Sequence, residues 1–91
     1  MEGKLIMLRS TSNQPVIRRL CEQYDGSATI CREDVFAEWQ RLGTIPVGVK
    51  VKREDVFEYD PVLFELMKVY DEALDNNPTE LVQLWKRAKP L

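Results

Sequence analysis

The sequence predicts a small soluble α+β domain with a three-stranded antiparallel sheet and about four helices, in the order β-α-α-β-β-α-α. Short runs of apolar or β-branched residues lie at 4–9 and 44–59. Helical spacing of apolar residues fills the segments between and after them, and residues 60–61 and 77–78 pair a capping residue with proline. With this length, residues 1–91 are expected to form a single compact domain.

The first half is expected to contain one strand and two helices. Residues 4–9 are short and apolar with no helix cap before them, which predicts a strand. Pro15 suits the first position of a helix that ends at Gly26. The apolar face of that helix would be Val16, Ile17, Leu20, Cys21 and Tyr24. A second helix ends at Gly43, but its start stays open, because residues 27–31 suit a loop, a short strand or an early helical turn.

A hairpin is expected next. Valine alternates with glycine and lysine over residues 47–52, which is the period of a strand. Residues 56–59 are its expected partner across a turn at 52–55, although the chain from Arg53 onward also suits a helical turn.

Two helices are expected to complete the chain. Asp60 caps the first, over residues 61–75, and this helix is apolar around most of its circumference, so we place it at the centre of the core. Its inward side chains would be Leu63, Met67, Tyr70 and Leu74. Asn77 and Glu80 suit a capping box at the start of the second. The buried face of this second helix would be Leu81, Val82, Trp85 and Ala88.

One pentapeptide occurs twice. Arg-Glu-Asp-Val-Phe stands at 32–36 and again at 53–57. The flanking residues differ, and one copy is expected in a helix and the other in the hairpin. We therefore interpret the repeat as a coincidence rather than a duplicated unit.

The composition argues against the commonest catalytic chemistry. The chain has no histidine, so it lacks the most frequent general base and the most frequent zinc ligand. Its four glycines are scattered and form no phosphate-binding loop. Carboxylates are plentiful but lie in charged stretches that are typical of solvated faces. We therefore expect a protein that is not an enzyme and that uses no metal or other cofactor.

Two cysteines leave one question open. Cys21 and Cys31 match no zinc pattern and no redox motif. We expect both to be reduced and partly buried. A disulfide would require their backbones to be neighbours, which the sequence does not decide.

The sequence contains no recognisable targeting segment. The apolar run near its start, residues 5–8, is too short for a signal peptide, and no segment approaches the length of a membrane span. These observations predict a cytoplasmic protein with no membrane partner.

The favoured function is a small non-enzymatic protein-interaction module, such as an adaptor, an inhibitor or a regulatory subunit. It would bind a protein partner or form a homodimer. Charge is segregated along the chain, with a net −5 over residues 58–77 and +2 over residues 78–91. Trp39 is a candidate binding residue, because tryptophan is enriched in the energetic centres of interfaces.

The alternative is a winged-helix DNA-binding transcriptional regulator. The expected strand, two helices and hairpin of residues 4–59 follow the order of that fold, and Lys50, Lys52 and Arg53 would line the wing. However, the helix that would enter the major groove, residues 31–42, carries a net charge of −1, and the whole chain carries −2. We therefore expect a protein partner rather than a nucleic acid, because DNA binders present a basic face to the phosphates.

Overall fold

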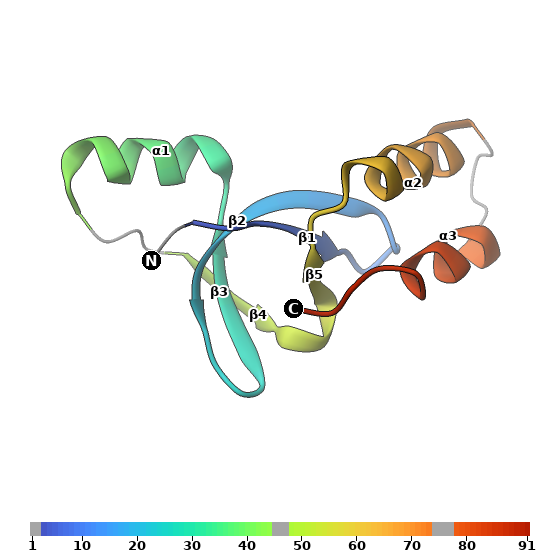
Figure 1. Cartoon of the computed structure of the whole chain (residues 1–91), viewed down its shortest axis with the longest axis horizontal. Helices are drawn as coiled ribbons and strands as arrows, with labels where there is room; N and C mark the ends of the chain where they lie inside the picture. Colours follow the sequence, from blue (N-terminus) through green and yellow to red (C-terminus); the bar gives the residue numbers. More distant parts are fainter. Residues whose placement is uncertain (1–2, 45–47, 74–77) are drawn as a thin grey trace.

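The computed structural model describes residues 3–44, 48–73 and 78–91. These residues form five strands, three α-helices and one turn of 3-10 helix (Figure 1). The strands are β1 (Leu5–Arg9), β2 (Pro15–Gln23), β3 (Ser27–Cys31), β4 (Val49–Lys52) and β5 (Val56–Glu58). The helices are α1 (Glu33–Leu42), α2 (Pro61–Ala73) and α3 (Pro78–Trp85), and the 3-10 turn is η1 (Arg53–Asp55). The α+β class is confirmed, but the three-stranded sheet with four helices is wrong.

The strands form one antiparallel sheet in the order β4-β3-β2-β1-β5. The predicted helix over residues 15–26 is wrong, because β2 pairs with β1 on one side and with β3 on the other. Every residue of β2 from Pro15 to Leu20 is half-buried, so both faces of this strand are partly covered. The alternation of apolar and polar residues that identifies a half-exposed strand is therefore missing from its sequence.

The predicted hairpin of residues 47–59 is also wrong. Residues 45–47 lie outside the described residues, and β4 pairs with β3 whereas β5 pairs with β1 at the opposite edge of the sheet. Between them the chain turns through η1, which is the helical turn that the sequence also allowed from Arg53. Because one short turn joins the two edge strands, the sheet must curl to bring β4 close to β5.

The curled sheet encloses one apolar cluster. All five strands contribute to it, together with the last residue of the chain: Ile6, Leu8, Leu20, Ala28, Ile30, Val51, Val56 and Leu91. Residues 89–91 run beside β5, where Glu58 N donates to Lys89 O at 2.8 Å and Leu91 N donates to Val56 O at 3.3 Å. The end of the chain therefore extends the sheet beyond β5.

A second apolar cluster lies between the outer face of β1 and β5 and the helical pair α2–α3. Its buried members are Met7, Phe57, Leu63, Phe64, Met67, Leu81, Leu84, Trp85 and Ala88. Asp60 caps α2 as expected, since its Oδ1 accepts hydrogen bonds of 3.1 Å from the backbone of Val62 and Leu63. The inward positions are confirmed for Leu63 and Met67, Tyr70 is half-buried, and the side chain of Leu74 lies outside the described residues.

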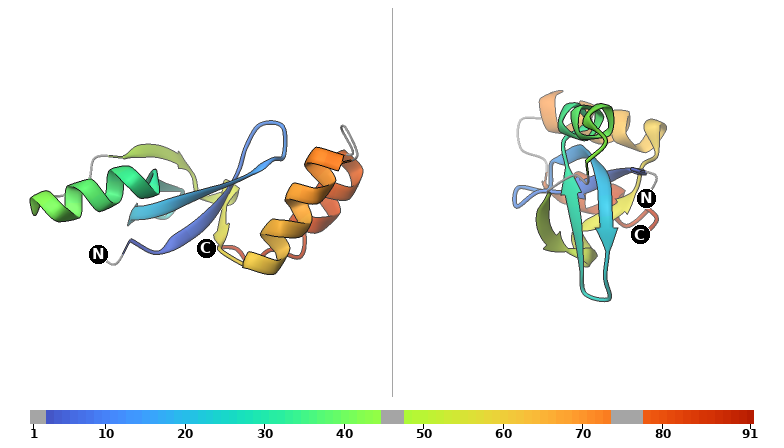
Figure 2. Two further views of the ribbon diagram at one scale, coloured as in Figure 1. Left: turned by 90° about the horizontal axis from the view of Figure 1, so that it is seen from above. Right: turned by 90° about the vertical axis from the view of Figure 1, so that its left-hand side faces the viewer.

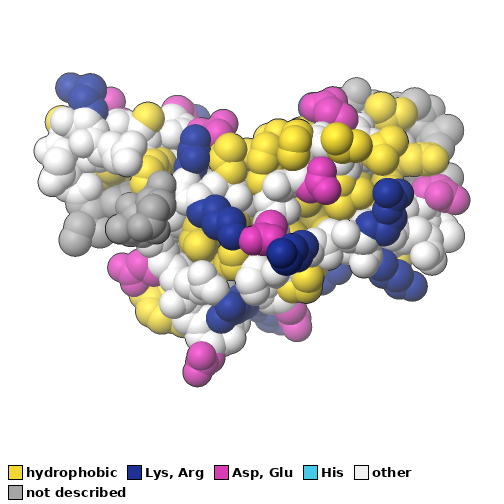
Figure 3. Space-filling view, viewed as in Figure 1, with side chains coloured by type: hydrophobic (Ala, Val, Ile, Leu, Met, Phe, Trp, Pro, Cys, Tyr) yellow, Lys and Arg dark blue, Asp and Glu magenta, His cyan; other side chains and the backbone are white. Residues whose placement is uncertain are grey.

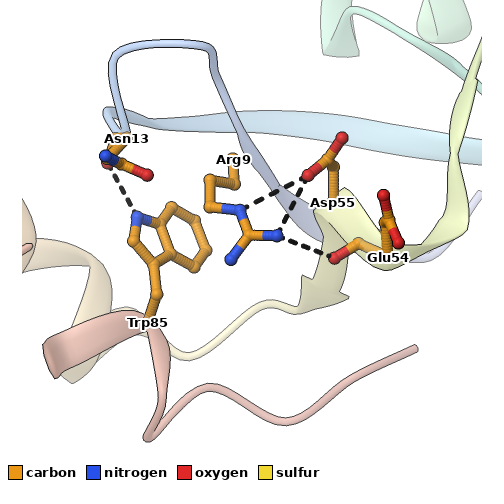
Figure 4. A network of polar contacts seen from close by, with 5 residues as sticks. All are labelled: Arg9, Asn13, Glu54, Asp55 and Trp85. Atoms are coloured by element: carbon orange, nitrogen blue, oxygen red, sulfur yellow. Dashed lines mark hydrogen bonds and ion pairs between the residues drawn. The ribbon is translucent and has the colours of Figure 1, made fainter. Parts of the chain in front are cut away.

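A polar network joins the β1–β2 turn to the second half of the chain (Figure 4). The indole Nε1 of Trp85 donates to the backbone carbonyl of Asn13 at 2.7 Å. Arg9 donates to the carboxylate of Asp55 at 3.1 Å and to the carbonyl of Glu54 at 3.3 Å. The last helix and η1 are therefore both fixed to the first hairpin of the sheet.

Helix α1 packs on the sheet far from α2 and α3 (Figures 1 and 2). Residues 27–31 before it form β3, one of the three structures that the sequence allowed, and Gly43 ends it as expected with a φ of 73°. Phe36 of α1 forms a third, smaller cluster with Cys21 and Cys31. With helices at its two ends, the molecule is elongated, with extents of 42 × 26 × 19 Å.

Candidate protein-interaction surface

The outer face of α2 carries an exposed apolar stripe. Val62 is 71% exposed, Val69 is 58% exposed and Leu66 is 37% exposed. Their spacing places them on one side of the helix, roughly 120° around it from the buried face. They line a shallow hollow of about 450 Å³ together with Pro61 and Glu65. Figure 3 shows hydrophobic side chains gathered over this part of the molecule.

The stripe corrects the prediction that α2 lies at the centre of the core. The helix is apolar on nearly all sides, but its buried side chains lie on the side that faces the sheet and α3. Val82 of α3, which the sequence placed inward, is also 39% exposed. The sequence contained an indication of this exposure, because α2 is apolar around most of its circumference. One sheet and one helix in a chain of this size cannot cover every side of such a helix.

The hollow beside the stripe contains an acidic side chain, and α2 lies in an acidic stretch of the sequence. Glu65 is exposed within the hollow, between Val62 and Val69 along the chain. Residues 58–77 hold six acidic residues and one basic residue, a net charge of −5, although Glu58 among them is paired with Lys4 and Lys89. A partner that covers the stripe must therefore accommodate negative charge beside apolar contacts.

The residues singled out from the sequence lie elsewhere. Trp39 is half-buried on α1, whereas Lys50 and Lys52 are exposed on the edge strand β4. The Nζ of Lys50 lies 5.5 Å from the centre of the Tyr24 ring. Arg53 in η1 donates to the carbonyl oxygens of Tyr24 and Leu91, at 3.0 and 3.3 Å. The guanidinium of Arg53 therefore holds the chain in place. None of the polar or ring contacts between described residues joins Trp39 to these three basic residues.

Lys52 and Arg53 border a cavity of about 540 Å³ between the β2–β3 turn, η1 and residues 90–91. Asp25 and Glu54 border it too, so acidic and basic side chains are mixed around its mouth. The remaining lining residues are Gly26, Pro90 and Leu91. This mixture does not provide the concentrated positive charge that recognises phosphate groups.

The observed order of elements differs from the one on which the winged-helix hypothesis was based. It needed two helices before the hairpin, but residues 15–31 form strands and β4 and β5 lie at opposite edges of the sheet. The described residues contain no group of three or more Cys, Asp or Glu side chains arranged to hold a metal ion. Within the same ranges, no helix has both the length and the apolar character needed to span a membrane.

The chain matches no protein-family model, no curated protein and no solved structure. Among the described residues, the outer face of α2 combines three aligned exposed apolar side chains with a hollow that they line.

Proposed function

We propose that the chain is a small non-enzymatic protein-interaction module, an adaptor, inhibitor or regulatory subunit, that binds a different protein through the outer face of α2. A cytoplasmic location is part of the same proposal. The observation that carries it is the apolar stripe of Val62, Leu66 and Val69, exposed on a well-packed helix. Aligned apolar side chains on an exposed helix face are typical of protein-interaction sites.

The spacing of the stripe indicates the shape of the partner. Val62, Leu66 and Val69 lie at positions i, i+4 and i+7 of α2. Such a ridge packs into the groove between the side-chain rows of another helix. We therefore expect the partner to present an amphipathic helix or a groove lined by helices.

The charge of this region indicates the chemistry of the partner. Lysine or arginine beside the partner's apolar contacts would complement Glu65 in the hollow and the acidic character of the sequence around α2. A symmetric dimer through the same face is disfavoured, because a two-fold axis through the centre of the stripe would bring Glu65 against its own copy. The proposed partner is therefore a different, basic protein rather than a second copy.

Site-specific photo-cross-linking tests the proposal in the source cells. The full chain would carry a benzophenone amino acid in place of Val69, and a matched chain would carry it in place of Leu42, which is exposed on α1. We expect a discrete protein adduct from position 69 and none from position 42. Adding Val62→Glu should abolish the adduct, because a charge would then be buried in the contact, whereas Leu42→Glu should leave it intact.

Two outcomes would contradict the proposal. Equal adducts from positions 69 and 42 would mean that the α2 face is not a selective contact. An adduct with the mass of two copies of the chain would replace the basic partner with a homodimer.

A further inference from the structure

Two buried thiols lie in contact between neighbouring strands. The Sγ atoms of Cys21 in β2 and Cys31 at the end of β3 are 3.2 Å apart. The register explains this contact, since Leu20 pairs with Ile30 but Glu22 pairs with Thr29, which leaves Cys21 as the extra residue of a bulge. A disulfide bond of about 2.05 Å requires the two sulfur atoms to approach by only about 1 Å.

The two thiols differ in their surroundings. Cys21 is 2% exposed and its thiol donates to Cys31 Sγ. Burial, together with this hydrogen bond, raises the pKa of Cys21 to about 12, so its sulfur keeps its proton. Cys31 is 7% exposed and accepts the hydrogen bond. Of the two, Cys31 is therefore the more exposed sulfur.

Each thiol borders a cavity, but the lining of the cavity at Cys21 includes the acidic residue Glu22, whereas no described acidic residue lines the one at Cys31, which better suits an anionic reagent. The cavity at Cys31 has a volume of about 390 Å³, and Arg18 and Arg32 line it beside the thiol. Most of its other lining is apolar: Leu8, Ile30, Val35, Gly48, Val49 and Val51. Among the described contacts, Arg18 makes one hydrogen bond, to the backbone carbonyl of Ile17, so its charge is not neutralised by a carboxylate. Arg32 is paired with the carboxylate of Asp34, so Arg18 is the guanidinium group that favours an anionic reagent at this opening.

We propose that Cys21 and Cys31 form a dithiol–disulfide site that is oxidised by an anionic small-molecule disulfide of the glutathione type. Cys31, having lost its proton to water, attacks one sulfur of the reagent, forms a mixed disulfide and expels one thiolate. Cys21 then gives its proton to the expelled thiolate, attacks the sulfur of Cys31, forms the internal disulfide and releases the second reagent thiolate, which takes up the proton that Cys31 lost to water. In total, two protein thiols are oxidised and one reagent disulfide is reduced to two thiols.

Intact-mass spectrometry of the full chain tests this site. The reduced protein would be incubated with increasing oxidised glutathione and quenched with acid. We expect one internal disulfide, with the loss of two hydrogen atoms in mass, and no accumulating adduct. Cys21→Ser should accumulate one glutathione adduct on Cys31, whereas Cys31→Ser should acquire its adduct on Cys21 at least about tenfold more slowly, because that thiol is more deeply buried and lies beside Glu22.

A second measurement uses the wild-type chain, so its result does not depend on whether a variant folds. Brief alkylation of the reduced protein with iodoacetamide, followed by peptide mapping, should label Cys31 before Cys21. The proposal fails if the wild type stays reduced in excess oxidised glutathione, if its cysteines pair between two molecules, or if Cys21 is labelled first.

Discussion

Trp85 and Asn13 are joined by a hydrogen bond although they are 72 residues apart in the chain. The indole of Trp85 also packs against Phe57 with ring centroids 5.0 Å apart, so the same side chain contacts both the β1–β2 turn and β5. Trp85→Phe keeps an aromatic ring but leaves the Asn13 carbonyl without this donor. We expect a loss of about 1–3 kcal/mol in the free energy of unfolding, measured by urea denaturation.

Trp39→Phe provides the matched control. Trp39 is half-buried on α1, and no side-chain hydrogen bond is recorded for it among the described contacts. We expect its loss to stay below about 1 kcal/mol. Equal losses from the two substitutions would show that the Trp85–Asn13 bond does not stabilise the fold.

Two neighbouring residues of α2 separate its buried and exposed faces. Met67 is fully buried, so Met67→Ala should cost about 2–5 kcal/mol through a core cavity. Leu66→Ala should cost less than about 1 kcal/mol, because that side chain is partly exposed and alanine favours helix. Chemical denaturation measures both, and a large loss from Leu66→Ala would mean that the stripe is covered within the chain itself.

Gly3 leaves no room for a side chain. A Cβ atom at this position would lie 2.2 Å from Cζ of Phe36, and the φ of Gly3 is +65°. Gly3→Ala should destabilise the protein by about 1–3 kcal/mol, through a clash under α1 and an unfavourable backbone conformation. Gly26→Ala is the control, since no atom lies within 4 Å of a Cβ there, and its thermal midpoint should remain close to that of the wild type.

The ion pair between Lys4 and Glu58 predicts a pH dependence of stability. The hydrogen bond from Lys4 Nζ, 2.6 Å long, lowers the pKa of Glu58, and Lys89 adds to the effect. Because the folded-state pKa is lowered, the stabilisation is present above the ordinary value of 4.5 and is lost as the pH falls through the folded-state pKa.

Glu58→Gln should therefore lower the urea midpoint at neutral pH and reduce its fall on acidification. Glu54→Gln is the control, because the carboxylate of Glu54 makes no ion pair among the described residues. Parallel titration curves for the wild type and Glu58→Gln would remove this ion pair as a cause of the pH dependence.

Duplex DNA is expected to bind more weakly than about 100 μM near physiological salt. Arg53 is held by two backbone carbonyls, which leaves Lys50 and Lys52 as the exposed basic side chains of β4, and the chain as a whole is acidic. Fluorescence anisotropy with a labelled random duplex at several salt concentrations measures this. Micromolar binding with a steep salt dependence that disappears in a Lys50→Ala/Lys52→Ala/Arg53→Ala variant would reverse the expectation.

Local chemistry was enough to predict α2. Asp60 accepts hydrogen bonds from the first turn, and Leu63 and Met67 face the core, as the cap and the spacing require. The sequence did not predict which other faces of α2 stay exposed, because this depends on how many elements pack around it. The candidate surface of Val62, Leu66 and Val69 was therefore missed, although each residue had been assigned to the right helix.

Sheet pairing was not accessible to local reasoning. The same five residues, Arg-Glu-Asp-Val-Phe, cap and begin α1 at 32–36 but form η1 and the start of β5 at 53–57. Val56 and Phe57 become strand because β1 offers them a partner, nearly fifty residues earlier in the sequence. β2 was not predicted for the same reason. Its strand conformation depends on pairing with two neighbouring strands rather than on the spacing of its own apolar residues.

The position of residues 89–91 beside β5 has a consequence for folding during synthesis, because these residues leave the ribosome after the strands that they contact. β1, β2 and β3 are consecutive and can pair as soon as they emerge from the ribosome. The outer edge of β1 stays unpaired until β5 has been synthesised. Trp85 and Leu91 close the two apolar clusters later still. A nascent chain stalled before these residues would expose the apolar surface of an unfinished sheet, which is the kind of surface that chaperones bind.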